Sequence, residues 1–598
     1  MPSPAVFPKP RPLFGAARWA VALALGVGLA LPGAAEETAP KAKPGAAEAA
    51  VAEGPIDSGA FLAARIATSH ADYTAAADWY ARALLTDPGN PDLLEGAILS
   101  NIGLGEFTPA AAMARALAEQ GVESPIGYLA LLINELTAED YAGVMARSAE
   151  GVRKGALLDT LVTAWAQVGL GRMSDATATF DSLTRSPEMA AFGLYHKALA
   201  LASAGDFEGA NAIFSDKNAG VLQQMRRGIL AHARVLSQLE RNPDALALLD
   251  ASFTGDPDPE LADLRRRLAA GEPVPFDIVA DAQDGMAEVF YTLAMTLAQE
   301  GDATQTLIYA RGAQALRPGQ QDAALLVAGL LEEQGQHELA IAVYASISAD
   351  NPSFYVAEIG RAEANYAAGR KEASLEILQG LARTQPDLLV AQVALADAYR
   401  RDERFAEARK SYDLAIGLLT EPAAENWPLY FSRGICAERM GDFDATVADL
   451  EEALRLNPEQ PQVLNYLGYS YVDRGENLDE ALGMIERAVA REPGSGYIID
   501  SLAWAYYRLG RYAEAVGPME QASLLEPVDP IVTDHLGDIY WAVGRTREAE
   551  FQWHRALSYG PEEKDATRIR AKLEKGLDAV LADEGAKPLA PVEAKATP

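Results

Sequence analysis

The chain has 598 residues, with 51 Lys and Arg against 85 Asp and Glu, and a formal net charge of −34 at pH 7. This charge repels phosphate backbones and anionic lipid headgroups, which excludes nucleic acid and membrane surfaces as expected partners and favours proteins or peptides. Cys436 is the only cysteine, which excludes an internal disulfide and a cysteine-rich metal site.

Residues 1–35 have the features of a secretory signal peptide. A basic start precedes an apolar run from Trp19 to Leu31, and small residues follow as far as Ala35. The run is shorter than the roughly 20 residues that span a bilayer. We therefore expect export to the periplasm, cleavage after Ala35 and no stable membrane span in the mature protein. An uncleaved N-terminal anchor is the alternative.

The region that follows is predicted to be helical but irregular. Residues 36–56, rich in Ala, Glu, Pro and Lys, are expected to form a flexible leader. Residues 57–250 are interpreted as a degenerate array of helical hairpins. Two Pro- and Gly-rich stretches then flank a short basic helix, so 251–286 is interpreted as an irregular joint between two halves. A longer loop inside one continuous superhelix is the alternative.

A period of 34 residues organises residues 287–561, which are interpreted as eight repeats. Pro318, Pro352 and Pro386 are spaced by this period, and a proline there ends the second helix of each repeat. Residues 562–584 are expected to form a capping helix, and 585–598 a disordered tail.

Two columns of the repeat indicate a pair of packed helices. Position 8 is Gly or Ala in every repeat and meets small residues at position 20, as Gly468 does at Ala481, so that two antiparallel helices approach closely. Glycine at position 15 follows the first helix, where positive φ is often required. The eight residues in this column are Gly301, Gly335, Gly369, Glu403, Gly441, Gly475, Gly510 and Gly544.

These columns resemble the tetratricopeptide repeat (TPR) family, whose unit is a 34-residue helix–turn–helix. The fullest match lies in the last three repeats, for example Leu467-Gly468, Tyr471 and Pro493. The resemblance implies an all-α, right-handed superhelical solenoid. Residues 427–561 also resemble bacterial envelope TPR adaptor proteins of C-terminal-processing peptidases. The cysteine of a lipoprotein anchor is missing here, so membrane tethering does not carry over.

No motif for chemistry is found in the mature chain. It lacks a phosphate-binding glycine loop and a nucleophile elbow, and its six histidines form no metal-ligand pair. Cys436 and His535 are expected to be structural. We therefore expect no catalytic residue, no metal, no cofactor and no enzymatic activity.

The resemblance does imply a binding groove. In this family the first helix of each repeat lines the concave side, with positions 2, 5, 9, 12 and 13 pointing inward. Aromatic rings beside carboxylates there suit extended peptides with apolar and basic side chains; the alternative is that some rings pack between repeats. The groove residues so predicted are Phe431, Asn465, Tyr469, Asp473, Tyr497, Asp500, Trp504, Tyr507, Arg508, Asp534, Asp538 and Trp541.

The predicted function is that of a non-catalytic periplasmic scaffold or adaptor that binds proteins or extended peptides, with delivery of substrates to an envelope protease as one role. A scaffold for envelope polysaccharide or outer-membrane assembly is a second hypothesis. An enzyme, or the accessory subunit of one, is the alternative of a different class. Sequence alone leaves the partner and any self-association open.

Overall fold

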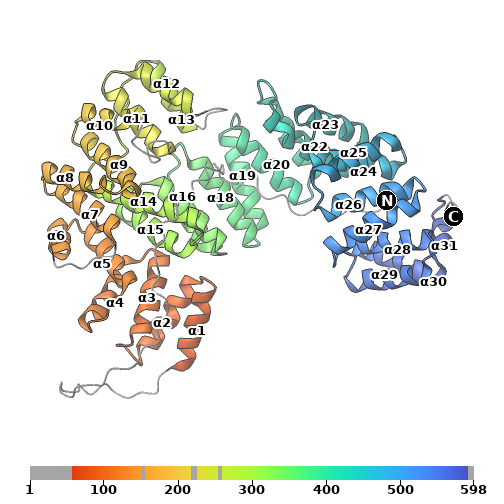
Figure 1. Cartoon of the computed structure of the whole chain (residues 1–598), viewed down its shortest axis with the longest axis horizontal. Helices are drawn as coiled ribbons and strands as arrows, with labels where there is room; N and C mark the ends of the chain where they lie inside the picture. The colour runs from red at the N-terminus through yellow and green to blue at the C-terminus, as the bar shows by residue number, and fades with distance from the viewer. Residues whose placement is uncertain (1–56, 150–154, 217–224, 254–258, 587, 590–598) are drawn as a thin grey trace. The chain divides into compact units, whose positions relative to one another are not determined.

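The computed structural model describes residues 57–149, 155–216, 225–253, 259–586 and 588–589 (Figure 1). These residues hold 31 α-helices and no strand, and successive helices pair into hairpins that stack on their neighbours. The predicted all-α solenoid of helix–turn–helix repeats is confirmed. The expected signal peptide (1–35), the leader (36–56) and most of the expected tail (585–598) lie outside the described residues. No described helix is long and apolar enough to cross a membrane.

The described residues fall into two compact units that divide between Ala394 and Leu395. The N-terminal unit (residues 57–394) contains α1 (Ser58–Ser69), α2 (Tyr73–Leu84), α3 (Pro91–Leu104), α4 (Phe107–Glu119), α5 (Pro125–Thr137), α6 (Tyr141–Ala149), α7 (Ala156–Gly169), α8 (Met173–Leu183), α9 (Pro187–Ser203), α10 (Phe207–Phe214), α11 (Arg226–Gln238), α12 (Asn242–Ser252), α13 (Pro259–Ala269), α14 (Ala282–Glu300), α15 (Ala303–Leu316), α16 (Gln321–Glu333), α17 (His337–Ala345), α18 (Phe354–Ala367) and α19 (Lys371–Thr384).

The C-terminal unit (residues 395–589) begins inside a helix. Its elements are α20 (Leu389–Arg401), α21 (Phe405–Gly417), the 3-10 helix η2 (Ala424–Asn426), α22 (Trp427–Arg439), α23 (Phe443–Leu456), α24 (Pro461–Arg474), α25 (Leu478–Arg491), α26 (Gly496–Arg508), α27 (Tyr512–Leu525), α28 (Pro530–Ala542), α29 (Thr546–Ser558), α30 (Glu563–Lys575) and α31 (Leu577–Asp583). The capping helix expected over 562–584 is thus two helices, because Gly576 interrupts it with a φ of 81°.

The N-terminal unit closes on itself. Helix α14 packs against α5, α7 and α9, and α15 packs against α3 and α5, so these two helices lie across the first helices of earlier hairpins (Figure 1). Arg311 of α15 donates from Nε to the Gly103 carbonyl at 3.0 Å, and the Tyr73 hydroxyl donates to Gln334 at 3.0 Å. The chain itself therefore covers the inner helices of this unit.

The described parts of the expected joint, residues 251–253 and 259–286, belong to this N-terminal unit. Leu261, Leu264 and Leu268 of α13 are buried in one apolar cluster with residues of α11 and α12. Val274 continues this packing, because its amide donates to the Ser237 hydroxyl at 2.9 Å. The segment is therefore packed into the N-terminal unit, and the division between units falls in α20 instead of at 251–286.

The turn after the first helix follows the predicted glycine column. All seven of its glycines have a φ between 69° and 85°, in the left-handed region that side chains with a Cβ rarely adopt. Glu403, which takes the eighth place, has a φ of 59°. The repeat therefore keeps this backbone shape even where it costs about 1–2 kcal/mol for a residue other than glycine.

Small residues between the paired helices are equally constrained. A Cβ added at Gly468 would lie 2.7 Å from Ile485 Cγ1 and 2.9 Å from the Ala481 carbonyl oxygen, closer than ordinary contact. Position 8 therefore meets position 20 across α24 and α25, as predicted.

We expect Gly468→Leu to lower the free energy of unfolding by about 1–3 kcal/mol, because a larger side chain overpacks this contact. The matched control is Gly483→Leu in α25, where nothing lies within 4 Å of an added Cβ. That change should leave stability equal or slightly higher, since leucine favours a helix more than glycine does. Urea unfolding measures both, and equal midpoints would contradict the packing described.

Candidate functional site

The predicted groove residues lie on α22, α24, α26 and α28, the first helices of the last four TPR-like hairpins. Their surroundings differ from one helix to the next. Phe431, Tyr469, Asp473, Tyr497, Trp504 and Trp541 are half-buried, and Arg508 is exposed. Asn465, Asp500, Tyr507, Asp534 and Asp538 are buried.

The centre of this surface is a stack of rings on α26 and α28. The indole of Trp504 lies parallel to Tyr507, with ring centroids 4.6 Å apart, and to His535, at 4.0 Å. His535 Nδ1 is 2.9 Å from Asp500 Oδ1. Burial opposes protonation of His535, but the Asp500 carboxylate outweighs it and raises the pKa of the imidazole. The protonated form of His535 is thereby favoured against the face of a half-buried tryptophan.

Asp534 and Asp538, predicted to face a ligand, are instead paired inside the protein. The ammonium group of Lys572 on α30 lies 2.7 Å from Asp534 and 2.6 Å from Asp538, and its side chain has no exposed surface. Trp553 Nε1 also donates to Asp538, at 2.9 Å. Burial raises the pKa of Asp538, but Lys572 and Arg568 outweigh it and hold the pKa below its usual range. These carboxylates therefore fix α30 to α28 and are not offered to a ligand.

Trp541, also predicted to face a ligand, is held by the C-terminal helices. Its Nε1 donates to Asp578 of α31 at 2.8 Å, and its ring lies 5.4 Å from that of Trp553. A Cβ added at Gly576 would be 2.8 Å from the indole. The ring thus packs against the segment that ends the array, which was the alternative left open by the sequence.

The half-buried side chains that remain follow one another by one repeat. Position 9 is occupied by Ile435, Tyr469 and Trp504 on α22, α24 and α26, and each is half-buried. Position 9 of the next repeat is Asp538, which is buried and paired with Lys572, so the column of half-buried residues ends there. Apolar and aromatic groups therefore line three consecutive first helices.

Asn465 on α24 is an unusual polar residue buried beneath this surface. It is 1% exposed, and neither Oδ1 nor Nδ2 has a hydrogen-bond partner among the described residues. An unpaired buried polar group costs about 1–3 kcal/mol, so this carboxamide is a poor choice for a purely structural core position. One residue further along, Tyr466 contacts Phe431 edge-on at 5.6 Å and donates from its hydroxyl to Glu438.

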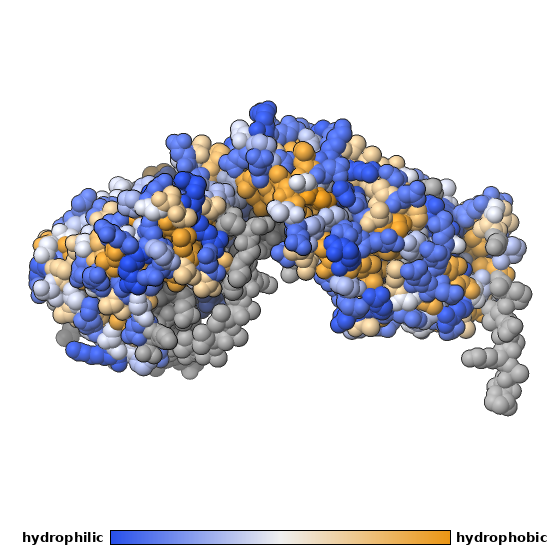
Figure 2. Space-filling model, turned by 90° about the horizontal axis from the view of Figure 1, so that it is seen from above, coloured by the Kyte–Doolittle hydropathy of each residue, from blue (hydrophilic) through white to orange (hydrophobic). Residues whose placement is uncertain are grey.

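Charged groups on this surface are mostly matched. Arg508 Nη2 donates to the Asp473 carbonyl at 3.0 Å, and its Nη1 is 3.5 Å from the Asp473 carboxylate. This pair is partly exposed and should contribute little to stability. On the face drawn in Figure 2, hydrophilic side chains cover most of the surface, and apolar side chains form separate patches between them.

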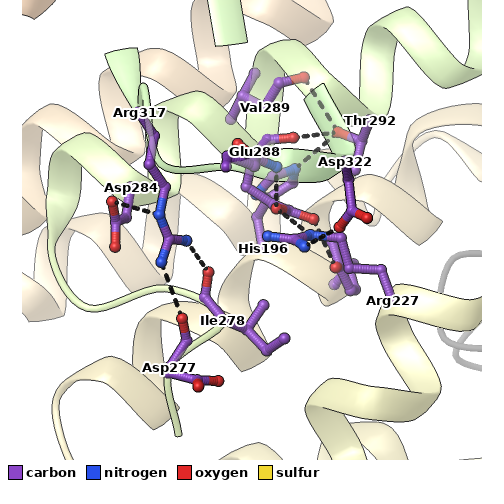
Figure 3. Close-up of polar contacts among 12 residues, drawn as sticks. His196, Arg227, Asp277, Ile278, Asp284, Glu288, Val289, Thr292, Arg317 and Asp322 are labelled. Atoms are coloured by element: carbon purple, nitrogen blue, oxygen red, sulfur yellow. Dashed lines mark hydrogen bonds and ion pairs between the residues drawn. The ribbon is translucent and has the colours of Figure 1, made fainter. Parts of the chain in front are cut away.

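A second polar cluster lies inside the N-terminal unit (Figure 3). Glu288 of α14 accepts from the Tyr195 hydroxyl at 2.8 Å and from Arg227 Nε at 2.6 Å, and Arg227 Nη1 also donates to Asp322 at 2.5 Å. Beside it, Arg317 donates to the Ile278 carbonyl at 2.5 Å. These groups are paired with one another, so the cluster ties α9, α11, α14 and α16 together.

His196 completes the same cluster and is neutral. Trp165 Nε1 donates to His196 Nδ1 at 3.2 Å, which leaves the proton of the neutral ring on Nε2, 3.4 Å from the Thr292 hydroxyl. Burial lowers the pKa of His196 to about 3. Among the described residues, no group of His, Cys, Asp and Glu is placed to hold a metal ion.

The sequence profile of the tetratricopeptide repeat family matches residues 431–496 and 472–524, which contain α24, α26 and most of α22. The hairpins within residues 431–524 therefore match tetratricopeptide repeats. A curated TPR repeat-containing protein of Pseudomonas aeruginosa is 28% identical over 185 residues, 31% of this chain and 31% of that protein. The chain thus spans about a third of the length of this relative.

Solved structures are also similar to this chain. The APC/C hetero-tetramer Cut9–Hcn1 covers 87% of this chain and 96% of its own, at 16% identity and a TM-score of 0.36. A tetratricopeptide repeat protein from Parabacteroides merdae covers 48% and 97%, at 14% identity and a TM-score of 0.33. TPR repeats generally mediate protein–protein interactions.

Two residues that shape the TPR surface were not among the predicted groove residues. His535 is at position 6 of its repeat, and Asp500 is at position 5 of the repeat before it, 35 residues earlier. This spacing is the sequence feature that could have indicated their contact. Lys572 lies beyond the last repeat, where the 34-residue period offers no guide to what it contacts.

Proposed function

We propose that the protein is a non-catalytic TPR scaffold that binds an extended segment of a partner protein on the inner face of α22, α24 and α26. The observation that carries this proposal is the half-buried column Ile435, Tyr469 and Trp504, with the unpaired carboxamide of Asn465 in the same layer. Rings of this kind bury a large area at low entropic cost. A carboxamide supplies N–H donors and a carbonyl acceptor, the same two kinds of polar group as a peptide unit.

The spacing of the helices sets the kind of ligand. Packed helices lie about 8–10 Å apart, and an extended chain advances about 3.3 Å per residue. An extended segment would therefore meet one of these positions about every third residue. The net charge of −34 favours a segment that also carries basic side chains, which would speed encounter at low salt.

We also infer that the protein acts in the periplasm, after cleavage at Ala35, and that it hands bound proteins to an envelope protease. The support is the apolar run that ends at Leu31 and the likeness of the C-terminal repeats to envelope adaptors. N-terminal sequencing of protein from cells tests the first inference; a mature form that begins at Met1 in the cytosol would refute it. Slower turnover of captured proteins after deletion of this chain tests the second.

We expect Tyr469→Ala with Trp504→Ala to weaken partner binding by at least about 30-fold, or roughly 2 kcal/mol, because both rings leave the proposed surface. Partners are captured with the wild-type chain from a periplasmic extract, identified by mass spectrometry, and titrated against the purified variant. The matched control is Leu524→Ala, which removes an 81% exposed leucine of α27. Helical content must be unchanged in both variants.

Two outcomes would contradict the assignment. If the double variant folds and binds every partner as tightly as before, the binding surface lies elsewhere on the chain. If it unfolds α26 and α28, the rings serve the core, and the stack of Trp504 on His535 is structural.

A further inference from the structure

His535 of α28 connects Trp504, in the column of the proposed binding surface, to a buried carboxylate of α26. Its imidazole lies parallel to the indole of Trp504, with ring centroids 4.0 Å apart and 16° between the ring planes. Its Nδ1 is 2.9 Å from Asp500 Oδ1. Trp504 is half-buried, whereas the side chains of His535 and Asp500 are only 12% and 5% exposed. The imidazole is therefore placed to hold the indole rather than to contact a ligand.

Asp500 favours the protonated form of this histidine. Among the described residues, His535 is the hydrogen-bond partner of the Asp500 side chain. A carboxylate with so little exposed surface is costly without a cation beside it. An imidazolium that stacks on an indole also gains a cation–π attraction that a neutral imidazole lacks. The stack is therefore tighter when His535 carries the proton.

We propose that His535 is a positioning residue of the binding surface: in its protonated form it holds Trp504 in the orientation that a partner contacts, and when it loses the proton the indole is released. This inference rests on the proposed function, since it takes Trp504 to contact the partner. When only molecules with a correctly held ring bind, the apparent affinity falls in proportion to their fraction. Binding is therefore expected to weaken as the pH rises through the pKa of folded His535.

The charges around His535 fix the direction of this dependence. Burial lowers the pKa of His535, but Asp500, with Asp534 and Asp538 adding to it, outweighs burial and raises the pKa. Burial also raises the pKa of Asp534, so the effect of His535 has to be separated by substitution. The groups around the stack are Asp500, Tyr507 and Arg508 of α26, Tyr512 of α27, Asp534 and Asp538 of α28, Trp553 of α29, and Arg568 and Lys572 of α30.

The fluorescence of Trp504 tests this positioning without a partner. A protonated imidazole in contact with an indole quenches its emission more strongly than a neutral one does. The signal of Trp504 is the difference between the emission of the full chain and that of its Trp504→Phe variant. We expect this difference to rise as the pH increases from 6 to 9, and the rise to be absent in chains that carry His535→Gln.

Two comparisons make this test specific. Asp500→Asn keeps the shape of the side chain but removes its charge, so the midpoint of the rise should move to lower pH. The corresponding signal of Trp427, which contacts Phe431 with ring centroids 5.9 Å apart, is the control and should not show the rise. A Trp504 signal that does not change with pH, or that changes equally with His535→Gln, would overturn the proposal.

A defined peptide measures the consequence for binding. The probe is a rhodamine-labelled peptide of alternating leucine and lysine, which is apolar, basic and extended like the segment proposed above, and lysine keeps its charge in this pH range. Fluorescence anisotropy should give an apparent Kd about 5-fold higher at pH 9 than at pH 6, which is the loss of an ordinary cation–π contact. With His535→Gln, the weaker binding should be found at both pH values.

Failure of this inference and failure of the proposed function give different results. Equally tight binding of the peptide by the wild-type chain at pH 6 and pH 9 would refute the role of His535 while supporting the binding surface. If the peptide binds at neither pH although the Trp504 signal rises as expected, the result counts against the proposed function and not against the contact by which His535 holds Trp504.

Discussion

Replacing Lys572 by alanine is expected to lower the free energy of unfolding of the C-terminal unit by about 3–5 kcal/mol. Removal of one partner from a buried ion pair leaves a charge without compensation, and here two carboxylates, Asp534 and Asp538, lose the same ammonium group. Arg568 lies 3.4 Å from Asp538 and would recover part of the loss. Urea unfolding followed by tryptophan fluorescence measures the change, because Trp553 donates to Asp538.

The control for this variant is on the same helix. Lys575 is 40% exposed and pairs with Asp583, so Lys575→Ala should change stability by no more than about 0.5 kcal/mol. Lys572→Met combined with Asp534→Asn and Asp538→Asn should restore most of the stability, because no charge is then left unpaired. An unchanged midpoint for Lys572→Ala would show that the triad is not buried in solution.

The two units are expected to respond to acid in opposite directions through their histidines. His196, in the N-terminal unit, has its pKa lowered to about 3 by burial, whereas an unfolded histidine has a pKa of about 6.5. The contribution of neutral His196 to the free energy of unfolding is complete above pH 6.5 and is lost as the pH falls toward 3. In this range the unfolded histidine binds a proton and the folded one does not. The loss is about 1.4 kcal/mol per pH unit, or about 2 kcal/mol at pH 5.

The contribution of His535, in the C-terminal unit, to the free energy of unfolding changes with pH in the opposite direction. Its folded pKa is raised above the unfolded value by Asp500, with Asp534 and Asp538 adding to the effect against burial. Its contribution is therefore complete below about pH 6.5 and is lost as the pH rises through the folded pKa. Mild acid strengthens the contact between α26 and α28.

Glutamine variants separate the two effects. The stability difference between wild type and His196→Gln should shrink as the pH falls from 7.5 to 5, and that between wild type and His535→Gln should grow. His554→Gln, at an exposed position of α29, is the control for the substitution itself. Parallel changes for His196→Gln and His535→Gln would contradict the opposite environments described.

The parts of this structure that could be predicted from sequence are those that depend on neighbouring repeats. Glycine at position 15 and small residues such as Gly468 are each required by a turn or a contact within about 20 residues, so they recur with the period. The division at α20 and the closure of the N-terminal unit depend on contacts such as that of Arg311 with Gly103, across 208 residues. Such pairs leave no periodic signal.

The predicted groove was limited for a similar reason. Inward positions of a repeat array were assigned as though the array continued past the last repeat. Tyr469 and Trp504 are half-buried, and their place in a groove stays a prediction. The structure places α30 and α31 against Asp534, Asp538 and Trp541, which the array pattern did not anticipate. An end of an array needs groups that satisfy its last repeat, and they come from outside the repeat pattern.

The long-range contacts that close the N-terminal unit also fix the order in which a growing chain can fold. The hydrogen bond of Gly103 can form only after Arg311 has been synthesised, and that of Tyr73 only after Gln334, 261 residues later. The C-terminal helices are instead joined by pairs such as Asp500 and His535, which are 35 residues apart. The C-terminal hairpins can therefore add one by one during synthesis, but the N-terminal unit completes late and as a whole. Until α14 and α15 leave the ribosome, the apolar inner sides of α3, α5, α7 and α9 stay uncovered, and this interval is when the nascent chain is most prone to aggregate.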